Sequence, residues 1–180
     1  RVLAREDFPT FPEASSVAAA TGKNDGVYVF FVSKKEETLG VSQYDQKNQR
    51  LTYPAPVELA GTPELVTAPS SNEAPAGDIG VFCLFSPENE DSEVGAEKQA
   101  LRLAHITPGG DGAWGARTTS ELPGVTSSPE AVKMLDVNGD DRLDVIVFRA
   151  YESALLLMQQ PDGTYHNVRK KKGFRSHLLR

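Results

Sequence analysis

The chain alternates between short apolar runs and polar, turn-forming segments. Three runs stand out because they are rich in β-branched and aromatic residues, and they cover residues 27–32, 81–85 and 145–148. A segment rich in Asn, Asp or Gly precedes each of them. Short runs of this composition between turn signals are typical of β-strands rather than helices. The pattern therefore predicts an all-β fold.

The three runs occupy equivalent places in three imperfect repeats, with a period of roughly 55–65 residues. After each run the sequence gives another apolar run, a polar turn and an aromatic or apolar segment, and the turns lie at 45–49, 108–112 and 161–163. A further segment, at 61–66 and again at 127–132, leads into the second and third runs. Each repeat therefore predicts four short strands, with the strong apolar run as the second.

Four antiparallel strands per repeat form the blade of a β-propeller. We therefore expect residues 1–180 to form a single propeller segment, with four-stranded antiparallel blades at about 14–62, 63–128 and 129–172. The outer strand of the first blade is expected at 51–53. A closed propeller typically has about four to eight blades, so further blades are expected from the same or another chain. The first residue is Arg rather than Met, which we interpret as a processed chain or a fragment.

The strong runs are too continuous for strands that keep one face in water. They are better explained if each blade is covered by its neighbours, as in stacked repeats. We therefore expect the repeats to stack. The outer faces of the terminal blades are expected to be bare, and apolar patches of that size favour association.

Composition narrows the class of protein. Hydrophobic residues make up 39% of the chain and charged residues 24%, which is ordinary for a globular domain. No apolar run approaches the roughly 20 residues of a membrane-spanning helix, so no membrane span is expected. The net charge of −6 argues against general nucleic-acid binding. A lone cysteine, Cys83, lies within a strong apolar run and is expected to be a buried thiol.

The strongest candidate chemistry lies in the loop 136–144, which reads Asp-Val-Asn-Gly-Asp-Asp-Arg-Leu-Asp. Oxygen-bearing side chains at alternate positions can converge on one cation when such a loop curls, and Ca²⁺ takes about six to eight oxygen ligands. The loop therefore predicts a Ca²⁺ site, with a metal-free turn as the alternative interpretation. The predicted ligands are the side chains of Asp136, Asn138, Asp140 and Asp144 and the backbone carbonyl of Arg142.

Two comparisons within the sequence refine this prediction. An EF-hand needs flanking helices and a Glu at position 12 of its loop, where this chain has Val147 inside an apolar run. The other two repeats lack the oxygen set. The first has only Thr21, Asn24 and Asp25 before its strong run, and the second has Asn72, Glu73 and Asp78. The sequence therefore predicts one calcium site and disfavours an EF-hand.

The loop resembles the D-x-N-x-D-G-x-x-D signature of the FG-GAP/VCBS repeats, which form integrin α-like calcium-binding β-propeller blades. In that family the loop joins the first two strands of a blade, and its ninth residue opens the second strand. Asp144, followed by an apolar run, matches this place. The sixth position, usually Gly, is Asp141 here. That position usually takes a positive φ, which Asp tolerates better than most residues, so the departure concerns calcium affinity more than fold.

The resemblance implies an extracellular or periplasmic, noncatalytic module that binds a protein or carbohydrate, with calcium rigidifying one blade. The alternative is an accessory or scaffold portion of a larger secreted enzyme, such as a hydrolase, lyase or redox protein. No nucleophile-elbow or paired acid–base pattern occurs in the sequence, so a catalytic role is not favoured. The basic cluster 169–172 with Arg175 is interpreted as a solvated connection. Trp114 and Tyr165 occupy matching places, which favours packing between blades.

Overall fold

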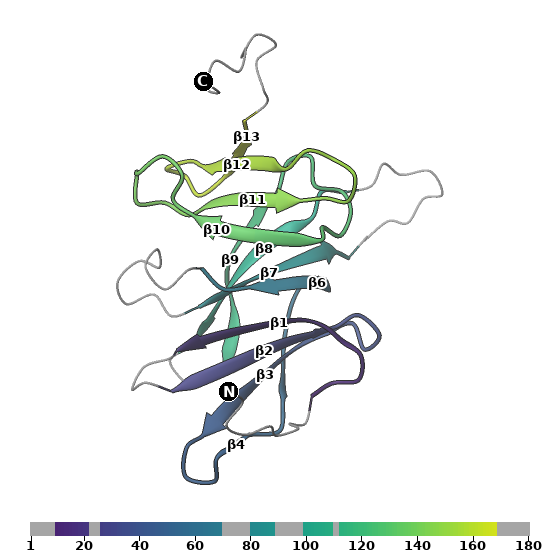
Figure 1. The fold of residues 1–180 in the computed structure, drawn as a ribbon, viewed down its shortest axis with the longest axis vertical. Helices are drawn as coiled ribbons and strands as arrows, with labels where there is room; N and C mark the ends of the chain where they lie inside the picture. Colours follow the sequence, from purple (N-terminus) through teal and green to yellow (C-terminus); the bar gives the residue numbers. More distant parts are fainter. Residues whose placement is uncertain (1–9, 22–25, 70–79, 89–98, 110–111, 169–180) are drawn as a thin grey trace, which may run out of the picture.

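A computed structural model of the protein describes residues 10–21, 26–69, 80–88, 99–109 and 112–168. Within these residues all regular secondary structure is β, and no helix occurs. The strands form three antiparallel sheets that follow one another along the chain (Figure 1). The all-β prediction is therefore confirmed.

The first sheet has the order β1-β2-β3-β4, and β5 also pairs with β3. Its strands are β1 (Ala14–Thr21), β2 (Val27–Ser33), β3 (Thr38–Asp45), β4 (Arg50–Leu51) and β5 (Ala55–Val57).

The outer edge of this sheet differs from the single strand expected at 51–53. The chain there is divided into β4 and β5, which pair with successive parts of β3. Pro54 lies between the two pieces and has no N–H to donate to a ladder. A single continuous outer strand is therefore interrupted at this residue.

The second and third sheets are simple four-stranded meanders, since each strand pairs with the next along the chain. The second contains β6 (Gly61–Thr67), β7 (Val81–Pro87), β8 (Arg102–Pro108) and β9 (Trp114–Glu121). The third contains β10 (Ala131–Leu135), β11 (Asp144–Phe148), β12 (Leu155–Gln159) and β13 (Tyr165–Asn167). The three strong apolar runs of the sequence are the second strands β2, β7 and β11, as predicted.

The three sheets stack face to face, with the second sheet in the middle (Figure 1). Successive residues of β7 point to opposite faces. Cys83 and Phe85 belong to the apolar cluster shared with the first sheet, and Leu84 belongs to the cluster shared with the third. All three side chains are at most 1% exposed. This double burial explains why the run 81–85 is apolar without alternation.

Aromatic side chains at the start of the outer strands reinforce both contacts between sheets. Trp114, at the start of β9, packs edge-on against Tyr28 and Phe30 of the first sheet, with ring centroids 4.9 and 4.8 Å apart. Tyr165, at the start of β13, is 8% exposed and belongs to the cluster between the second and third sheets. The prediction that these two residues pack between repeats is confirmed.

Polar contacts join the first strands of neighbouring sheets. The Ser16 hydroxyl of β1 donates to the Val66 carbonyl and accepts from the Val66 amide of β6, both at 3.1 Å. The Thr67 hydroxyl of β6 donates to the Val132 carbonyl of β10 at 3.3 Å. The strands β1, β6 and β10 therefore lie next to one another, each the first strand of its sheet.

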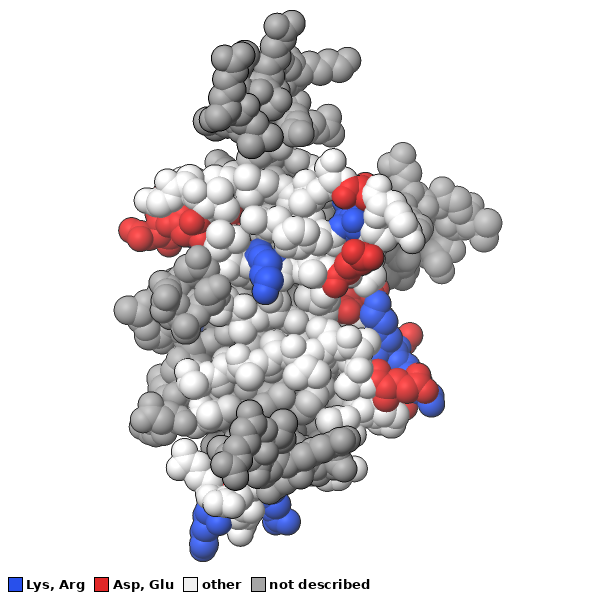
Figure 2. All heavy atoms as spheres, viewed as in Figure 1, with Lys and Arg blue, Asp and Glu red and all other residues white. Residues whose placement is uncertain are grey.

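Charged side chains are distributed unevenly over the surface. In Figure 2, acidic side chains gather at the level of the third sheet, at the end where the connection between β10 and β11 lies. On the opposite side, basic and acidic side chains intermingle. The ion pair between Lys34 and Glu64, at 2.9 Å, links the turn after β2 to β6. The acidic end contains the candidate cation loop.

Candidate functional site

The candidate cation loop, residues 136–144, connects β10 to β11, which are the first two strands of the third sheet. Asp144 is the first residue of β11. Both flanking elements are strands, whereas an EF-hand loop is flanked by helices. The loop therefore occupies the place in its sheet that the sequence predicted.

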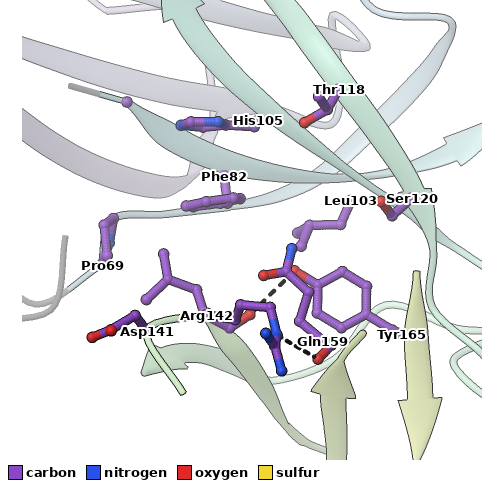
Figure 3. Close-up of a pocket in the computed structure, with 12 residues that line it drawn as sticks. Pro69, Phe82, Leu103, His105, Thr118, Ser120, Asp141, Arg142, Gln159 and Tyr165 are labelled. Atoms are coloured by element: carbon purple, nitrogen blue, oxygen red, sulfur yellow. Dashed lines mark hydrogen bonds between the residues drawn. The ribbon is translucent and has the colours of Figure 1, made fainter. Parts of the chain in front are cut away.

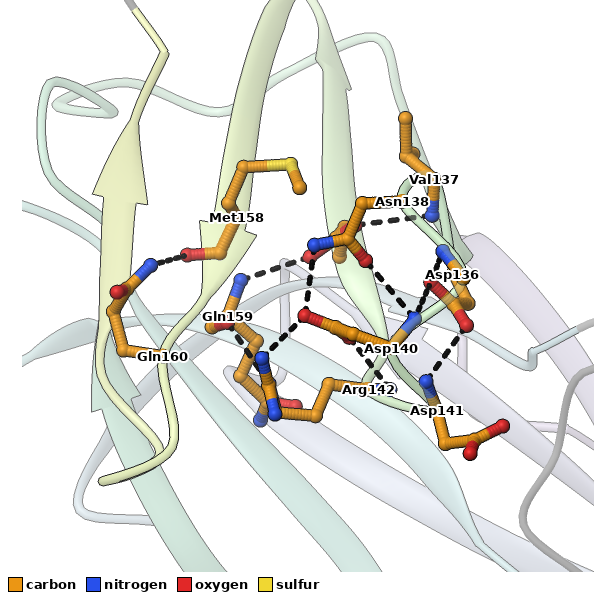
Figure 4. A network of polar contacts seen from close by, with 11 residues as sticks. Asp136, Val137, Asn138, Asp140, Asp141, Arg142, Met158, Gln159 and Gln160 are labelled. Carbon is orange, nitrogen blue, oxygen red and sulfur yellow. Dashed lines mark hydrogen bonds and ion pairs between the residues drawn. The ribbon is translucent and has the colours of Figure 1, made fainter.

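The Asp136 carboxylate organises the loop through backbone amides (Figure 4). Its Oδ1 accepts hydrogen bonds from the amides of Gly139 at 2.7 Å and Asp140 at 3.1 Å. Its Oδ2 accepts from the amide of Asp141 at 2.8 Å. An Asp side chain that bonds to amides downstream in this way curls the chain back on itself. The loop is thus closed around its first residue.

The same amides stabilise the charged form of Asp136. Partial burial raises the pKa of this carboxyl group, but the hydrogen bonds from the amides of Asp141, Asp140 and Gly139 outweigh that effect. The net result is a pKa below the ordinary value for Asp. Hydrogen bonds to the ionised form always act in this direction.

Two residues of the loop take the left-handed conformation. Gly139 has φ 76° and Asp141 has φ 62°. A positive φ was expected at the sixth loop position, and the structure confirms it for Asp141. Most side chains disfavour this conformation, whereas Asp and Asn tolerate it.

Asp144 fastens the end of the loop to the sheet. Asp144 is fully buried. One carboxylate oxygen accepts from the Val137 amide at 3.0 Å, and the other accepts from the Gln159 amide of β12 at 2.9 Å. A buried carboxylate needs such partners. Burial first, and then the charge of Asp144, raises the pKa of the neighbouring Tyr165.

Arg142 plays a part that sequence reasoning missed. Only its backbone carbonyl was predicted to contribute, but its guanidinium group forms an ion pair with the Asp140 carboxylate. The Arg142 Nε also donates to the Gln159 carbonyl at 3.3 Å. Asp140 and Arg142 are two residues apart in a bent loop, with Asp141 at φ 62° between them, so strand alternation could not have predicted this contact.

The donor set of the loop matches calcium in kind, since carboxylate, amide and carbonyl oxygens are the ligands that Ca²⁺ takes. Asn138 lies beside Asp140, because its side-chain amide donates to the Asp140 carboxylate at 2.7 Å. Among the described residues, no group of three or more His, Cys, Asp or Glu side chains is arranged to hold a metal ion. The Asp140 carboxylate is paired with the Arg142 guanidinium, so a cation in this loop would compete with Arg142 for it.

A pocket lies next to this loop, between the second and third sheets (Figure 3). Its volume is about 160 Å³. Phe82 of β7 and His105 of β8 form a parallel ring stack on one side, with centroids 4.6 Å apart and an angle of 9°. The remaining lining residues come from β8, β9, the third sheet and the adjoining segments, and include Leu103, Thr118, Ser120, Asp141, Arg142, Leu143, Gln159 and Tyr165.

A wider groove, of about 650 Å³, shares part of this lining. The two hollows have Thr118, Ser120, Gln159 and Tyr165 in common. The groove continues between β9 and the turn before β13, where it adds Thr119, Glu121, Pro123, Asp162, Gly163 and Thr164. Its walls therefore carry hydroxyl, amide and carboxylate groups beside apolar surface.

The remaining candidate residues are the lone cysteine, Cys83, and several polar and basic side chains. Burial, and then the charge of Glu64, raises the pKa of Cys83 to about 12. Cys83 is thus the buried thiol that the sequence predicted. The basic cluster 169–172 with Arg175, and Asn24, Asp25, Asn72, Glu73, Asp78 and His177, lie outside the described residues.

The described part of the chain contains no helix long and apolar enough to cross a membrane. Comparisons with protein-family models, with curated proteins and with solved structures found no match to this chain.

Proposed function

We propose that this chain is a noncatalytic, calcium-stabilised β-propeller module of the FG-GAP/VCBS kind that binds a protein or a carbohydrate. The observation that carries the proposal is the loop 136–144, which joins the first two strands of a four-stranded sheet and ends on the buried Asp144. That is the place and the closing residue that the resemblance implies for a calcium-binding blade.

The arrangement of the sheets supports a propeller. The blades of a propeller are four-stranded antiparallel sheets set radially around a central channel, so their first strands are neighbours. Here the first strands β1, β6 and β10 are joined by the hydrogen bonds of Ser16 and Thr67. In this proposal the three sheets are consecutive blades, and further blades of the same or another chain complete the ring.

Calcium in this module would be held by the side chains of Asp136, Asn138, Asp140 and Asp144 and by the Arg142 carbonyl. The ion neutralises carboxylates that otherwise repel one another. It also ties the turn between β10 and β11 to the start of β11, which rigidifies the blade. Extracellular or periplasmic residence is proposed with it, because a site of modest affinity fills where calcium is abundant.

The alternative proposal is an accessory or scaffold portion of a larger secreted hydrolase, lyase or redox protein. The two proposals differ in what the rest of the protein contains. Sequencing the full transcript or gene separates them, because a catalytic domain on the same chain favours the second and further blades alone favour the first.

Thermal unfolding with and without calcium tests the proposed module. A ligand bound only by the native state adds about 2.7 kcal/mol at a hundredfold excess over its Kd. We expect a higher melting temperature in millimolar calcium than in chelator, and we expect Asp140→Ala to abolish the difference. Asp162→Ala is the matched control, since Asp162 also closes a turn of the third sheet through Thr164. Equal melting temperatures in calcium and chelator, with no heat of binding by calorimetry, overturn the proposal.

A further inference from the structure

The pocket beside the cation loop and the groove that continues from it form one depression. They share four residues, Thr118, Ser120, Gln159 and Tyr165. The depression runs from the ring of Phe82 to the turn before β13, and both the second and third sheets line it. A ligand that entered the pocket would therefore extend along the groove.

The inner pocket offers a flat apolar surface. One face of the Phe82 ring lies against His105, and the other is turned towards the side of the pocket that Arg142 occupies (Figure 3). Leu103 and Leu143 add further apolar surface. A six-membered ring fits the volume of about 160 Å³, since an apolar cavity of about 150 Å³ accepts benzene.

The groove offers hydrogen-bonding groups in addition to apolar surface. Hydroxyl groups come from Thr118, Ser120 and Thr164, and an amide comes from Gln159. Among these, the Ser120 hydroxyl already donates to the Gly163 carbonyl at 3.0 Å and retains lone pairs as an acceptor. A ligand with hydroxyl groups at short intervals matches this lining.

The charges around the depression disfavour an anionic ligand. The guanidinium of Arg142 is already paired with Asp140. Asp141 lies at the inner pocket and Glu121 and Asp162 at the groove. Hydrogen bonds from Thr164 lower the pKa of Asp162, so this carboxylate stays ionised at neutral pH. Carboxylates repel anions but accept hydrogen bonds from hydroxyl groups.

We propose that this depression binds a neutral carbohydrate, with one pyranose ring in the inner pocket against Phe82 and the following sugar units along the groove. Pyranose rings have an apolar face that packs on an aromatic ring and a rim of hydroxyl groups, and the lining supplies a partner for each. This inference rests on the proposed binding function and gives it a site and a ligand class.

Saturation-transfer NMR followed by calorimetry tests the proposal with the whole chain in calcium-containing buffer. The probes are D-glucose, D-galactose, D-mannose and N-acetyl-D-glucosamine, linear trisaccharides of each, and glucuronate as an anionic probe. We expect a neutral sugar to bind, and its trisaccharide to bind more tightly because the groove adds contacts. Glucuronate is expected to bind more weakly than glucose.

Isosteric variants place the ligand in the depression. Thr118→Val and Gln159→Leu each remove a polar group and are expected to weaken binding by about fivefold to tenfold, the effect of one lost hydrogen bond. Thr21→Val and Gln43→Leu make the same exchanges on the first sheet and are expected to leave binding unchanged. Melting temperatures of all four variants show whether each is folded.

Any of three results with the sugar probes overturns the proposal: no neutral sugar binds, glucuronate binds best, or Thr118→Val and Gln159→Leu bind like the controls while folded. Binding of an extended peptide library in place of sugars also overturns it, in favour of strand addition at β9. A calcium-dependent rise in melting temperature without sugar binding leaves the calcium-stabilised module standing. Loss of both effects overturns both proposals.

Discussion

At the scale of single residues, the conformation of the loop 136–144 is determined by the groups to which each carboxylate forms hydrogen bonds. Asp136 accepts three amides of its own loop, and this pattern is readable from the sequence because the partners are close along the chain. Asp144 bonds to Gln159, 15 residues away in β12. That contact depends on the pairing of β11 with β12, which residue spacing alone does not fix.

The lowered pKa of Asp136 predicts a pH-dependent contribution to stability. A carboxyl group whose folded pKa lies below its unfolded value stabilises the fold above the unfolded pKa, and this stabilisation is lost as the pH falls through the folded pKa. Asp136→Asn, which has a single acceptor oxygen, is therefore expected to unfold at lower urea concentration than the wild type at pH 7. The gap should close as the pH falls below about 4, the ordinary pKa of Asp.

Asp141→Asn is the control, because Asn also tolerates the positive φ of this position. We expect its unfolding midpoint to follow the wild type throughout. Urea titrations in chelator between pH 3 and pH 7 measure both variants. A gap for Asp136→Asn that stays constant down to pH 3 contradicts the role given to the ionised carboxylate.

At the scale of elements, the strong apolar runs could be predicted and the sheet edges could not. The run at β7 is apolar on both faces because a neighbouring sheet covers each of them, whereas β2 and β11 each contribute to one of the two apolar clusters. The edges depend on single residues, such as Pro54, which separates β4 from β5. A bulge between Pro63 and Leu65 of β6 is likewise a local irregularity of pairing that periodicity does not reveal.

The contact between β1 and β6 provides a test at this scale. The Ser16 hydroxyl bonds to both backbone groups of Val66 in a partly buried position. Ser16→Ala is expected to destabilise the chain by about 1–2 kcal/mol, because backbone groups at the contact lose their partner. Ser15→Ala is the matched control, since the Ser15 hydroxyl bonds within its own sheet, to the Val32 carbonyl at 3.3 Å. Chemical denaturation of both variants measures the difference, and equal losses of stability contradict the role of Ser16 as a link between sheets.

At the scale of the whole molecule, the three sheets differ in how well they are covered. The second sheet has a neighbour on both faces, and β7 contributes side chains to both apolar clusters. The terminal sheets each have one face turned away from the stack (Figure 1). On those sheets Val17 is 58% exposed and Phe148 is 41% exposed. The stacking of the sheets was predicted from the unbroken apolar runs. Which residues remain exposed could not be predicted, because it depends on the register in which the strands pair.

This difference predicts a gradient of local stability along the stack. Amide hydrogen exchange requires local or global opening, and segments with few buried contacts open most easily. We expect the slowest exchange in β7, whose side chains at 83–85 are almost fully buried. We expect faster exchange in β12 and β13, the last two strands of the third sheet. Exchange followed by mass spectrometry on the isolated 180-residue chain measures the gradient. If further blades are supplied by a longer chain, protection of the third sheet should rise towards that of the second, because its outer face is then covered. Uniformly strong protection of all three sheets in the isolated monomer contradicts an open stack of blades.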